Sequence, residues 1–445
     1  MPISPARVAA FRILLQVDQE DAYAAELLHS QRYAKLAAAD HGLATELVMG
    51  VLRWRSWLDQ EIARQSSLSL TKLDPEILTS LRLAAYQLMF LDRIPARAAI
   101  HESVELVKQA RKRSAVSFTN AVLRKLAGLA QQGSAASGIA ASKTSSQLAA
   151  QSAHPKWLVE RWVREFGFDS AAKICSYDQQ IPETEIRISD PAVEEELKGE
   201  NVQLEAGRLL LSSRRVLAGG LTKTPAFHQG RIAIQDEASQ LVALLVGQGS
   251  MILDCCAAPG GKTRALAEQN PSATIVAAEL HPHRARLLRQ LVSAKNVQVV
   301  AADARNLPLT ALFDRILVDA PCSGTGTLAR NPEIKWRVKP EDLLDLHTRQ
   351  VSILRSAMQS VAPRGRMVYA TCSLEREENE AVVESALSSD SSIRLLNCRE
   401  SLEQLRSQGE LVWGDPGSLT SGPYLRTIPG VHPCDGFFAA ILEKE

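Results

Sequence analysis

The chain has 445 residues, of which 45% are hydrophobic and 23% are charged, and its formal net charge is +1. This length exceeds one ordinary domain core, and the composition is that of globular proteins rather than of disordered or membrane-spanning chains. The small net charge excludes a chain that attracts nucleic acid by bulk charge, so any such contact needs local basic patches.

The beginning of the chain lacks the continuous hydrophobic region of a signal peptide, and no window approaches 18 uncharged apolar residues. We therefore expect a cytoplasmic protein that does not contact a membrane. Its seven cysteines include no C-x-x-C pair, and the odd number fits reduced thiols better than a disulfide framework. A structural zinc site is not expected, and we predict no metal ligands.

Residues 1–130 are predicted to form an all-α domain. The apolar residues between 77 and 89 recur at the spacing of one helix face, and Asp74-Pro75-Glu76 is a typical helix start. Basic residues cluster near the end of this region, at 111–113 and 124–125. The region could dock RNA or a protein, although composition alone favours an ordinary solvated helical bundle.

Residues 131–153 are rich in Ala, Ser, Gly and Gln and are predicted to be a flexible linker. Residues 154–231 are predicted to form a small α+β unit that binds RNA. Trp157 and Trp162 lie on one helix face, where aromatic residues more often form a core than stack on bases.

Two predicted strands follow in this small unit, at residues 185–188 and 208–216. The second exposes Arg208, Arg214 and Arg215, which form one of the local basic patches. We expect these arginines to contact RNA, although such a patch alone is more often a solvated surface.

Residues 232–445 alternate between apolar strands and amphipathic helices. The predicted strands are 251–255, 274–279, 297–301, 315–319 and 366–372, and the predicted helices are 262–269, 282–294 and 341–361. This alternation predicts a parallel sheet that is covered by helices on both faces. Ligands of such sheets bind at the carboxyl ends of the strands.

The sequence DCCAAPGGKT at 254–263 forms the first strand end and a glycine-rich turn into a helix. A P-loop would need glycine at Cys256, and the dinucleotide fingerprint G-x-G-x-x-G is absent. The loop could hold another nucleotide, or it could be a structural turn without a ligand.

Acidic residues at the next two strand ends favour an adenosine ligand. Glu279 could accept both hydroxyls of a ribose, and Asp303 could accept from an adenine amino group. Lys262 is the only basic partner for a triphosphate, so the pattern suits S-adenosylmethionine. The alternative is that the acids cap helices, which applies best to Glu279 before His281-Pro282.

Two cysteines end neighbouring strands, Cys322 in Pro-Cys and Cys372 in Thr-Cys-Ser. Either one alone could be a buried structural thiol. Together, beside a methyl donor, they suggest addition of a thiolate to carbon 6 of a pyrimidine, which makes carbon 5 nucleophilic. Lys262 could favour the thiolate, and Asp319 could hydrogen-bond the cytosine ring.

These motifs resemble those of a known family, the RNA cytosine-5 methyltransferases of the Nop2/NSUN/Sun group. The similar segments are DCCAAPGGKT, DAPCSG at 319–324, RNPEIKWR at 330–337, ATCSL at 370–374 and DGFFAA at 435–440. IPARAAIHESVELVKQ at 94–109 and SFTNAVLRKL at 117–126 resemble the NusB-like domain of one bacterial branch. The resemblance implies a multidomain protein with an all-α NusB-like domain, a small α+β unit and a Rossmann-like class I methyltransferase domain.

The resemblance implies that Cys372 is the nucleophile and that Cys322 assists release of the methylated base, with Asp319 and Lys262 also in the catalytic group. The implied S-adenosylmethionine contacts are Cys256, Ala257, Ala258, Pro259, Gly260, Gly261, Lys262, Glu279, Arg284, Asp303 and Asp319. Glu279 is a departure, since the family usually has aspartate there, and the longer side chain leaves bidentate ribose binding possible.

The predicted activity is methylation of carbon 5 of a cytosine in 16S rRNA, either naked or in an early small-subunit assembly intermediate, by a monomer. Arg330, Lys335, Arg337 and Lys339 are expected to contact the RNA. Alternatives are methylation of tRNA or 23S rRNA by the same mechanism, attack by Cys322 instead of Cys372, and an RNA-binding, antitermination-like factor.

Overall fold

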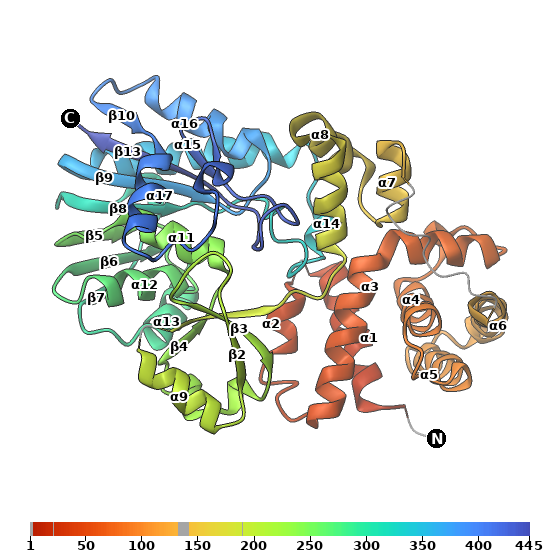
Figure 1. Cartoon of the computed structure of the whole chain (residues 1–445). Coiled ribbons are helices and arrows are strands. Elements are labelled where there is room, and N and C mark those ends of the chain that lie inside the picture. Colours follow the sequence, from red (N-terminus) through yellow and green to blue (C-terminus); the bar gives the residue numbers. More distant parts are fainter. Residues whose placement is uncertain (1–2, 21, 132–141, 189) are drawn as a thin grey trace. The chain divides into compact units, whose positions relative to one another are not determined.

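The computed structural model describes residues 3–20, 22–131, 142–188 and 190–445 (Figure 1). The chain divides into two compact units. Met1–Ile181 and Leu328–Val338 form the first, here called the helical unit, and Pro182–Thr327 and Lys339–Glu445 form the second, here called the sheet unit. The described parts contain no helix that is long and apolar enough to cross a membrane.

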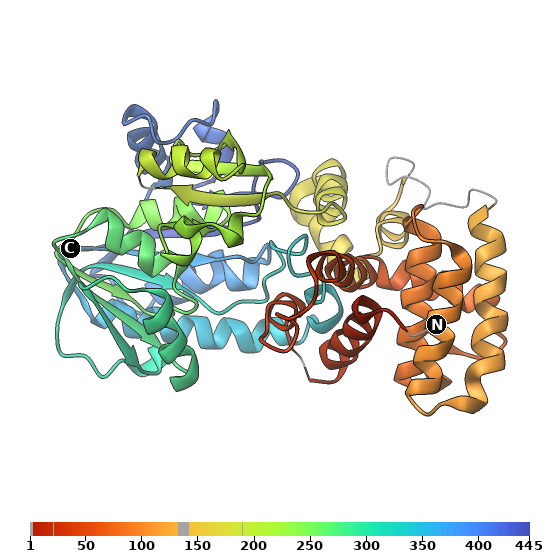
Figure 2. The same ribbon diagram turned by 90° about the horizontal axis from the view of Figure 1, so that it is seen from below.

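The helical unit is built from helices alone in the part of the chain that the structure describes. They are α1 (Pro5–Gln19), α2 (Ala24–Leu28), α3 (Ala38–Gln65), η1 (Leu70–Lys72), α4 (Pro75–Phe90), α5 (Ala96–Gln109), η2 (Arg113–Ala115), α6 (Val116–Gln131), α7 (Ser145–Gln151), α8 (Lys156–Asp178) and α14 (Ile334–Arg337). Figures 1 and 2 show α4, α5 and α6 side by side in orange. The all-α prediction is therefore confirmed.

Helix α4 illustrates how the sequence specifies this bundle. Pro75 occupies the first helical position, as expected, whereas the Asp74 side chain makes no capping hydrogen bond. Ile77, Leu81 and Ala84 are buried in the core that α4 shares with α1 and α3. Burial of this face, rather than helix propensity alone, accounts for most of the stability of the helix.

The expected linker is partly wrong, because residues 145–151 form helix α7. The Thr144 side chain accepts a hydrogen bond from Gln147 N at 3.2 Å, which caps the helix, and Leu148 is buried. The sequence did not predict this short helix because the region is low in hydrophobic residues, and the helix buries only one pair of them. The rest of the linker prediction, at 132–141, lies outside the described residues.

Helix α8 belongs to the helical unit, whereas the sequence placed it with the small α+β unit. Trp162 on this helix is only 1% exposed, which confirms that it is a core residue. Gly167 has φ +79° and ψ 164°, so the chain kinks within α8 at a residue without a side chain.

The smaller of two sheets in the sheet unit has the order β2-β3-β1-β4 and is antiparallel at each pairing. Its strands are β1 (Thr184–Ile188), β2 (Gln203–Ala206), β3 (Ser213–Ala218) and β4 (Ile232–Ile234), and its helices are α9 (Pro191–Gly199), η4 (Leu221–Lys223) and α10 (Pro225–His228). Ile186, Val193 and Leu197 form its own buried core. This part is the predicted α+β unit without its first helix.

The larger sheet has nine strands in the order β11-β12-β13-β9-β8-β5-β6-β7, with β10 also paired to β13. The strands are β5 (Met251–Asp254), β6 (Thr274–Glu279), β7 (Val297–Ala301), β8 (Phe313–Asp319), β9 (Val361–Thr371), β10 (Ile393–Leu396), β11 (Thr420–Ser421), β12 (Tyr424–Arg426) and β13 (Phe438–Lys444). The five predicted strands are β5 to β9, and they are parallel. The prediction of a wholly parallel sheet is wrong at β13, which runs antiparallel to β9.

Helices cover both faces of this sheet (Figure 1). They are α11 (Glu237–Val246), α12 (Gly261–Gln269), α13 (Pro282–Leu291), η5 (Ala304–Asn306), α15 (Asp342–Gln359), η6 (Arg376–Glu378), α16 (Glu380–Leu387), α17 (Cys398–Ser407) and η7 (Pro416–Leu419). Side chains alternate along β8, so Leu317 joins the core of α11 whereas Ile316 and Val318 join the core of α15. The sheet is therefore buried on both faces, and its loops carry the polar side chains.

Candidate active site

The predicted site residues lie at the carboxyl ends of adjacent parallel strands. Asp254 ends β5, Glu279 ends β6 and Asp319 ends β8, while Cys372 directly follows β9. Since β9, β8, β5, β6 and β7 are neighbours in that order, their ends meet at one edge of the sheet (Figure 1). The edge is where ligands of open α/β sheets bind.

The glycine-rich loop between β5 and α12 is fixed against the next strand. Ala257 N donates to Ala278 O at 2.9 Å. Gly260 has φ +115°, and a Cβ there would lie 2.7 Å from Leu288 Cδ1 and Val292 Cγ2. Both the backbone angle and the close approach require glycine at this position. The predicted cofactor residues 256–261 therefore occupy one tight turn.

Asp254 is buried directly beneath this turn. Thr263 Oγ1 donates to Asp254 Oδ2 at 2.7 Å, whereas Oδ1 has no hydrogen-bond partner among the described residues. Burial raises the pKa of Asp254 to about 7, and the Thr263 hydrogen bond opposes this shift. The buried Oδ1 is an acceptor facing a strand-end loop, and a ligand amine would satisfy it.

The other predicted cofactor acids differ in their surroundings. Glu279 is buried, and its Oε1 accepts from His281 N at 3.0 Å, but α13 has no side-chain cap, so Glu279 does not cap this helix. Asp303 forms a 2.6 Å ion pair with Arg305, and this hydrogen bond lowers the pKa of Asp303. Arg284 is exposed and donates to Ala258 O at 3.4 Å. A ligand of Asp303 would have to compete with Arg305.

Lys262 and Asp319 form a close ion pair, with Nζ and Oδ2 2.7 Å apart. Burial would lower the pKa of Lys262, but Asp319 and the nearby Cys372 raise it above its ordinary value. The ammonium also lies 5.1 Å from the centre of the Phe437 ring. Lys262 is therefore a fixed cation at the strand ends, paired with Asp319.

The two predicted catalytic cysteines are brought together by adjacent strands β8 and β9. The Sγ atoms of Cys322 and Cys372 are 3.3 Å apart, and both residues are half-buried. The hydrogen bond to Cys372, burial and the negative charge of Cys372 raise the pKa of Cys322 well above its ordinary value. Cys322 is therefore the thiol of the pair that is held in its protonated form.

The DGFFAA segment packs against the loops that carry Cys322 and Cys372 through backbone hydrogen bonds. Gly326 N donates to Cys372 O at 2.9 Å, and Gly436 N donates to Gly326 O at 2.8 Å. A Cβ on Gly326 would lie 2.1 Å from Gly436 O and 2.9 Å from Cys372 O. The loop that carries Cys322 therefore fits between the Cys372 loop and residue 436 only because Gly326 lacks a side chain.

Comparison with known proteins independently identifies the family of this chain. A family model described as "16S rRNA methyltransferase RsmB/F" matches residues 241–443, and one described as "NusB family" matches residues 4–128. A Bacillus subtilis (strain 168) protein named "Probable ribosomal RNA small subunit methyltransferase B" is 35% identical over 392 residues, covering 85% of this chain and 87% of the relative. The chain belongs to the RsmB/F family of rRNA methyltransferases.

Two further similarities extend over two thirds or more of the chain. A Synechocystis (strain PCC 6803) protein, also named "Probable ribosomal RNA small subunit methyltransferase B", is 32% identical and covers 99% of both chains. A solved structure of a "Methyltransferase Homolog Protein" from Pyrococcus horikoshii is 26% identical, with a TM-score of 0.56 over 68% of this chain and 100% of that chain. The resemblance drawn from the motifs is thus confirmed, together with the NusB-like and methyltransferase folds.

The RsmB/F motif RNPEIKWR holds a correction. Lys335 is 2% exposed, and its Nζ donates to Arg53 O at 2.9 Å and to Ala153 O at 3.2 Å within the helical unit. Trp336 Nε1 donates to Leu52 O at 2.7 Å. The expectation that Lys335 contacts RNA is wrong, because the lysine binds a backbone carbonyl within α3 and a loop carbonyl in a buried core.

The arginines of the small sheet are paired with carboxylates. Arg214 Nε lies 2.8 Å from Glu194 Oε2, and Arg215 Nη1 lies 3.1 Å from Glu183 Oε1. Arg215 also binds Glu205. Their positive charge is therefore largely compensated locally, which the spacing of basic residues alone did not reveal.

Sequence reasoning missed Glu378 and the serines that follow the two cysteines. Ser323 and Ser373 both hydrogen-bond the carboxylate of Glu378, which is completely buried. Glu378 lies in a run of charged residues, REENE, that is typical of an exposed turn. The available signal was position alone, since the run follows Cys372 within a few residues.

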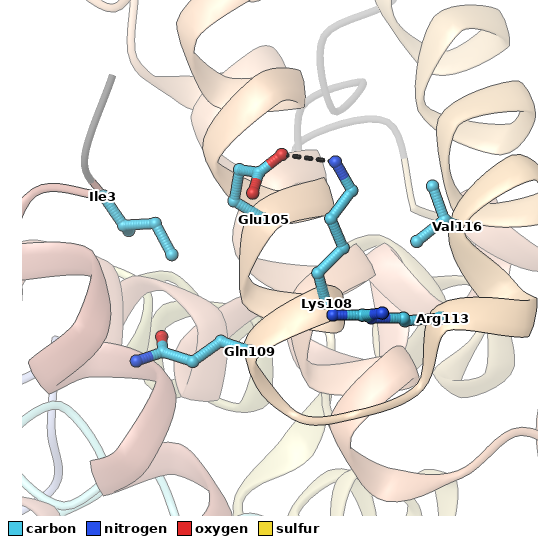
Figure 3. A pocket seen from close by; sticks show the side chains of 6 residues that line it. All are labelled: Ile3, Glu105, Lys108, Gln109, Arg113 and Val116. Carbon is cyan, nitrogen blue, oxygen red and sulfur yellow. Dashed lines mark hydrogen bonds and ion pairs between the residues drawn. The ribbon is translucent and has the colours of Figure 1, made fainter.

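The helical unit also contains a pocket of about 640 Å³ (Figure 3). Its lining consists of Ile3, Glu105, Lys108, Gln109, Arg113 and Val116. Glu105 and Lys108 form a 2.6 Å ion pair on its rim. None of the predicted site residues lines this pocket. Among the described residues, no group of three or more His, Cys, Asp and Glu is placed to hold a metal ion.

Proposed function

We propose that this RsmB/F-family chain transfers a methyl group from S-adenosylmethionine to carbon 5 of a cytosine in 16S rRNA. The observation that carries the proposal is the 3.3 Å approach of Cys322 and Cys372, beside the Lys262–Asp319 ion pair. The relatives named as small-subunit rRNA methyltransferases support the choice of RNA.

The residues at the strand ends fit S-adenosylmethionine by their chemistry. The unsatisfied Asp254 Oδ1 suits the amino group of the methionine portion, and the buried Glu279 carboxylate suits the ribose hydroxyls. The tight turn at residues 256–261 would accommodate the backbone approach of such a ligand. Asp303, Asp319 and Arg284 complete the proposed cofactor group. When bound, the cofactor would supply an electrophilic methyl group on a sulfonium sulfur.

Cys372 is the proposed nucleophile. Its thiolate, stabilised by Lys262, adds to carbon 6 of the cytosine and makes carbon 5 an enamine carbon. Carbon 5 can then take the methyl group that a bound S-adenosylmethionine would supply, with the electron pair of the broken bond left on the sulfur of the donor. Asp319 can hydrogen-bond the ring and compensate the charge that develops there.

Cys322 is the proposed base for release. Before attack, the charge on Cys372 keeps Cys322 protonated. Once Cys372 is bonded to carbon, that charge is gone, so Cys322 can give its proton to solvent water and then, as a thiolate, accept the proton on carbon 5. The double bond between carbons 5 and 6 forms again, and the Cys372 thiolate leaves. The two thiols thus act in sequence.

RNA carrying 5-fluorocytosine tests this proposal, because fluorine at carbon 5 blocks the release step. Wild-type protein with S-adenosylmethionine should form a covalent complex with such 16S rRNA, and Cys372→Ala should form none. Cys322→Ala should accumulate complex even with ordinary RNA. Cys398→Ala, at a buried cysteine outside the strand-end group, is the control that should behave as wild type.

Three outcomes would replace the proposal in part or in whole. The reverse pattern in Cys322→Ala and Cys372→Ala would make Cys322 the attacking thiol. Complex formation with tRNA or 23S rRNA fragments, but not with 16S rRNA, would change the substrate while keeping the mechanism. Absence of both S-adenosylmethionine binding and complex formation would favour an RNA-binding, antitermination-like role.

A further inference from the structure

Both cysteine loops of the sheet unit are joined by one buried carboxylate, that of Glu378. This residue ends η6, which follows β9 directly, and it is 0% exposed. Ser323 N donates to Glu378 Oε1 at 2.7 Å, and the hydroxyls of Ser323 and Ser373 both donate to Oε2. Ser323 follows Cys322, and Ser373 follows Cys372. One side chain therefore binds the residue after each thiol.

A second set of contacts holds Glu378 itself in place. Gln350 Nε2 on α15 donates to Glu378 Oε1 at 3.0 Å and to Pro321 O at 2.9 Å. Tyr369 on β9 donates from its hydroxyl to Glu378 O at 2.6 Å. The carboxylate is thus anchored to the strand and to a covering helix, and it cannot shift without breaking several hydrogen bonds.

The neighbouring Asn379 binds the Cys372 loop from the other side. Its Nδ2 donates to Ser373 O at 2.9 Å, and its Oδ1 accepts from Thr371 Oγ1. The backbone around Cys372 is therefore fixed before and after the thiol. The two loops also contact each other, through the hydroxyls of Ser323 and Ser373 and through Leu374 N, which donates to Thr325 Oγ1 at 2.9 Å, and Glu378 adds a carboxylate that binds both.

All four of these donors to the Glu378 carboxylate are neutral. A buried carboxylate is costly unless it is fully hydrogen-bonded, and here the donors come from Ser323, Ser373 and Gln350. Only a carboxylate offers two acceptor oxygens for both loops at once. Glutamine has the same shape but only one acceptor oxygen, so at least two of these four donors would lose their acceptor.

We propose that Glu378 is a positioning residue for the two thiols: by binding the serine after each cysteine, it holds Cys322 and Cys372 at the separation that their sequential roles require. This inference rests on the proposed function. Glu378 acts through Ser323 and Ser373. Displacement of a reacting group by about 1 Å lowers the reaction rate on the order of 10²-fold.

Glu378→Gln in the full chain tests the inference, with Glu384→Gln as the matched control. Glu384 lies on α16, is 56% exposed and pairs with Arg376 at the surface. With 5-fluorocytosine RNA and S-adenosylmethionine, Glu378→Gln should form covalent complex roughly 10²-fold more slowly than wild type, with an unchanged KM for RNA. Glu384→Gln should match wild type. A wild-type rate in folded Glu378→Gln would overturn the inference.

A second measurement needs neither RNA nor cofactor. Iodoacetamide alkylation of Cys322, followed by mass spectrometry across a pH series, reports when this thiol loses its proton. The charge of Glu378 contributes to the raised pKa of Cys322, after the Cys372 hydrogen bond and burial. Loss of the Glu378 anchor should weaken the Cys322–Cys372 hydrogen bond, which is the largest cause of the raised pKa, so alkylation of Cys322 in Glu378→Gln should begin at lower pH. An unchanged pH profile would overturn the inference.

These readouts separate the inference from the proposed function. If wild-type protein forms no covalent complex, the proposed function fails whatever Glu378→Gln does. If Glu378→Gln does not fold, Ser373→Ala provides the test, because it removes one anchor and leaves the carboxylate its other donors. Ser373→Ala should slow complex formation with an unchanged KM for RNA. A wild-type rate there would contradict the positioning role.

Discussion

Replacing the buried Lys335 with methionine should change how the stability of the helical unit depends on pH. Lys335 Nζ is held by Arg53 O and Ala153 O, close to the buried pair of His154 and Asp178. Methionine has a similar length and no charge, so it fills the same volume but loses the two hydrogen bonds. The variant therefore isolates the contribution of one proton to folding.

The size of the effect follows from the pKa of Lys335. Burial lowers it from 10.5 to about 7, with Asp178 opposing the shift. Between these two values the unfolded chain binds a proton that the folded chain lacks, so stability rises with pH. The slope from this group is at most about 1.4 kcal/mol per pH unit, and it vanishes below pH 7 and above pH 10.5.

Tryptophan fluorescence during urea unfolding measures this slope. Five of the six tryptophans lie in the helical unit: Trp54, Trp57, Trp157, Trp162 and Trp336. Between pH 7.5 and 9.5, we expect wild type to gain stability more steeply than Lys335→Met, by up to about 1.4 kcal/mol per unit. Lys108→Met, at a lysine that is 44% exposed, should keep the wild-type slope. Equal slopes in wild type and Lys335→Met would refute proton loss on folding.

His154 acts in a separate pH window. Burial, followed by the charge of Lys335, lowers the pKa of His154 well below 6.5. The unfolded chain therefore takes up a proton as pH falls through 6.5, and the folded chain does not. As the pH falls through 6.5, the stability of both wild type and Lys335→Met should therefore decrease. Because Lys335 contributes only above pH 7, the effects of His154 and Lys335 can be distinguished.

Gly326→Ala should reduce methyl transfer by roughly 10²-fold or prevent folding, because the new Cβ would meet Gly436 O at 2.1 Å. Gly414→Ala, at a site with open space, is the control and should match wild type in methyl transfer and thermal unfolding. Full activity in Gly326→Ala would disprove the close approach. Lys262→Met should lower kcat by about 10²-fold and move the pH optimum upward, since the Cys372 thiolate loses its cation. A pH profile identical to wild type would remove Lys262 from thiolate stabilisation. The double variant Arg214→Ala, Arg215→Ala should change the slope of log binding constant against log salt concentration by less than about 1, because both guanidinium groups are already ion-paired. A fall of about 2 in this slope would mean that RNA displaces the glutamates from the two arginines.

The strand ends could be predicted from sequence because their signals are local. Apolar runs that end in Asp254, Glu279 and Asp319 identify strands β5, β6 and β8 at nearly their true bounds. Parallel neighbours then have to share one edge, so the approach of Cys372 to Cys322 followed from topology. Burial of the sheet on both faces requires apolar residues along each strand, so these local patterns predict the strands.

Other features depended on partners far away in the chain. The reversed direction of β13 arises because residues 438–444 pair with residues 366–371, which no local pattern encodes. Lys335 and Glu378 resemble surface charges in sequence, and each is buried by hydrogen bonds to distant backbone or side-chain groups. Charged residues are buried only when they are satisfied, and the satisfying groups are tertiary.

The division of the chain at Leu328–Val338 has a consequence for how such proteins can be built and rearranged. The chain passes between the units after residues 181, 327 and 338. No single cleavage or gene fusion point therefore separates an intact helical unit from an intact sheet unit. During synthesis, the helices made first await Lys335 and Trp336, which complete their interior only after most of the central strands have been translated. Exchange of the amino-terminal region between relatives would have to carry this short internal segment as well.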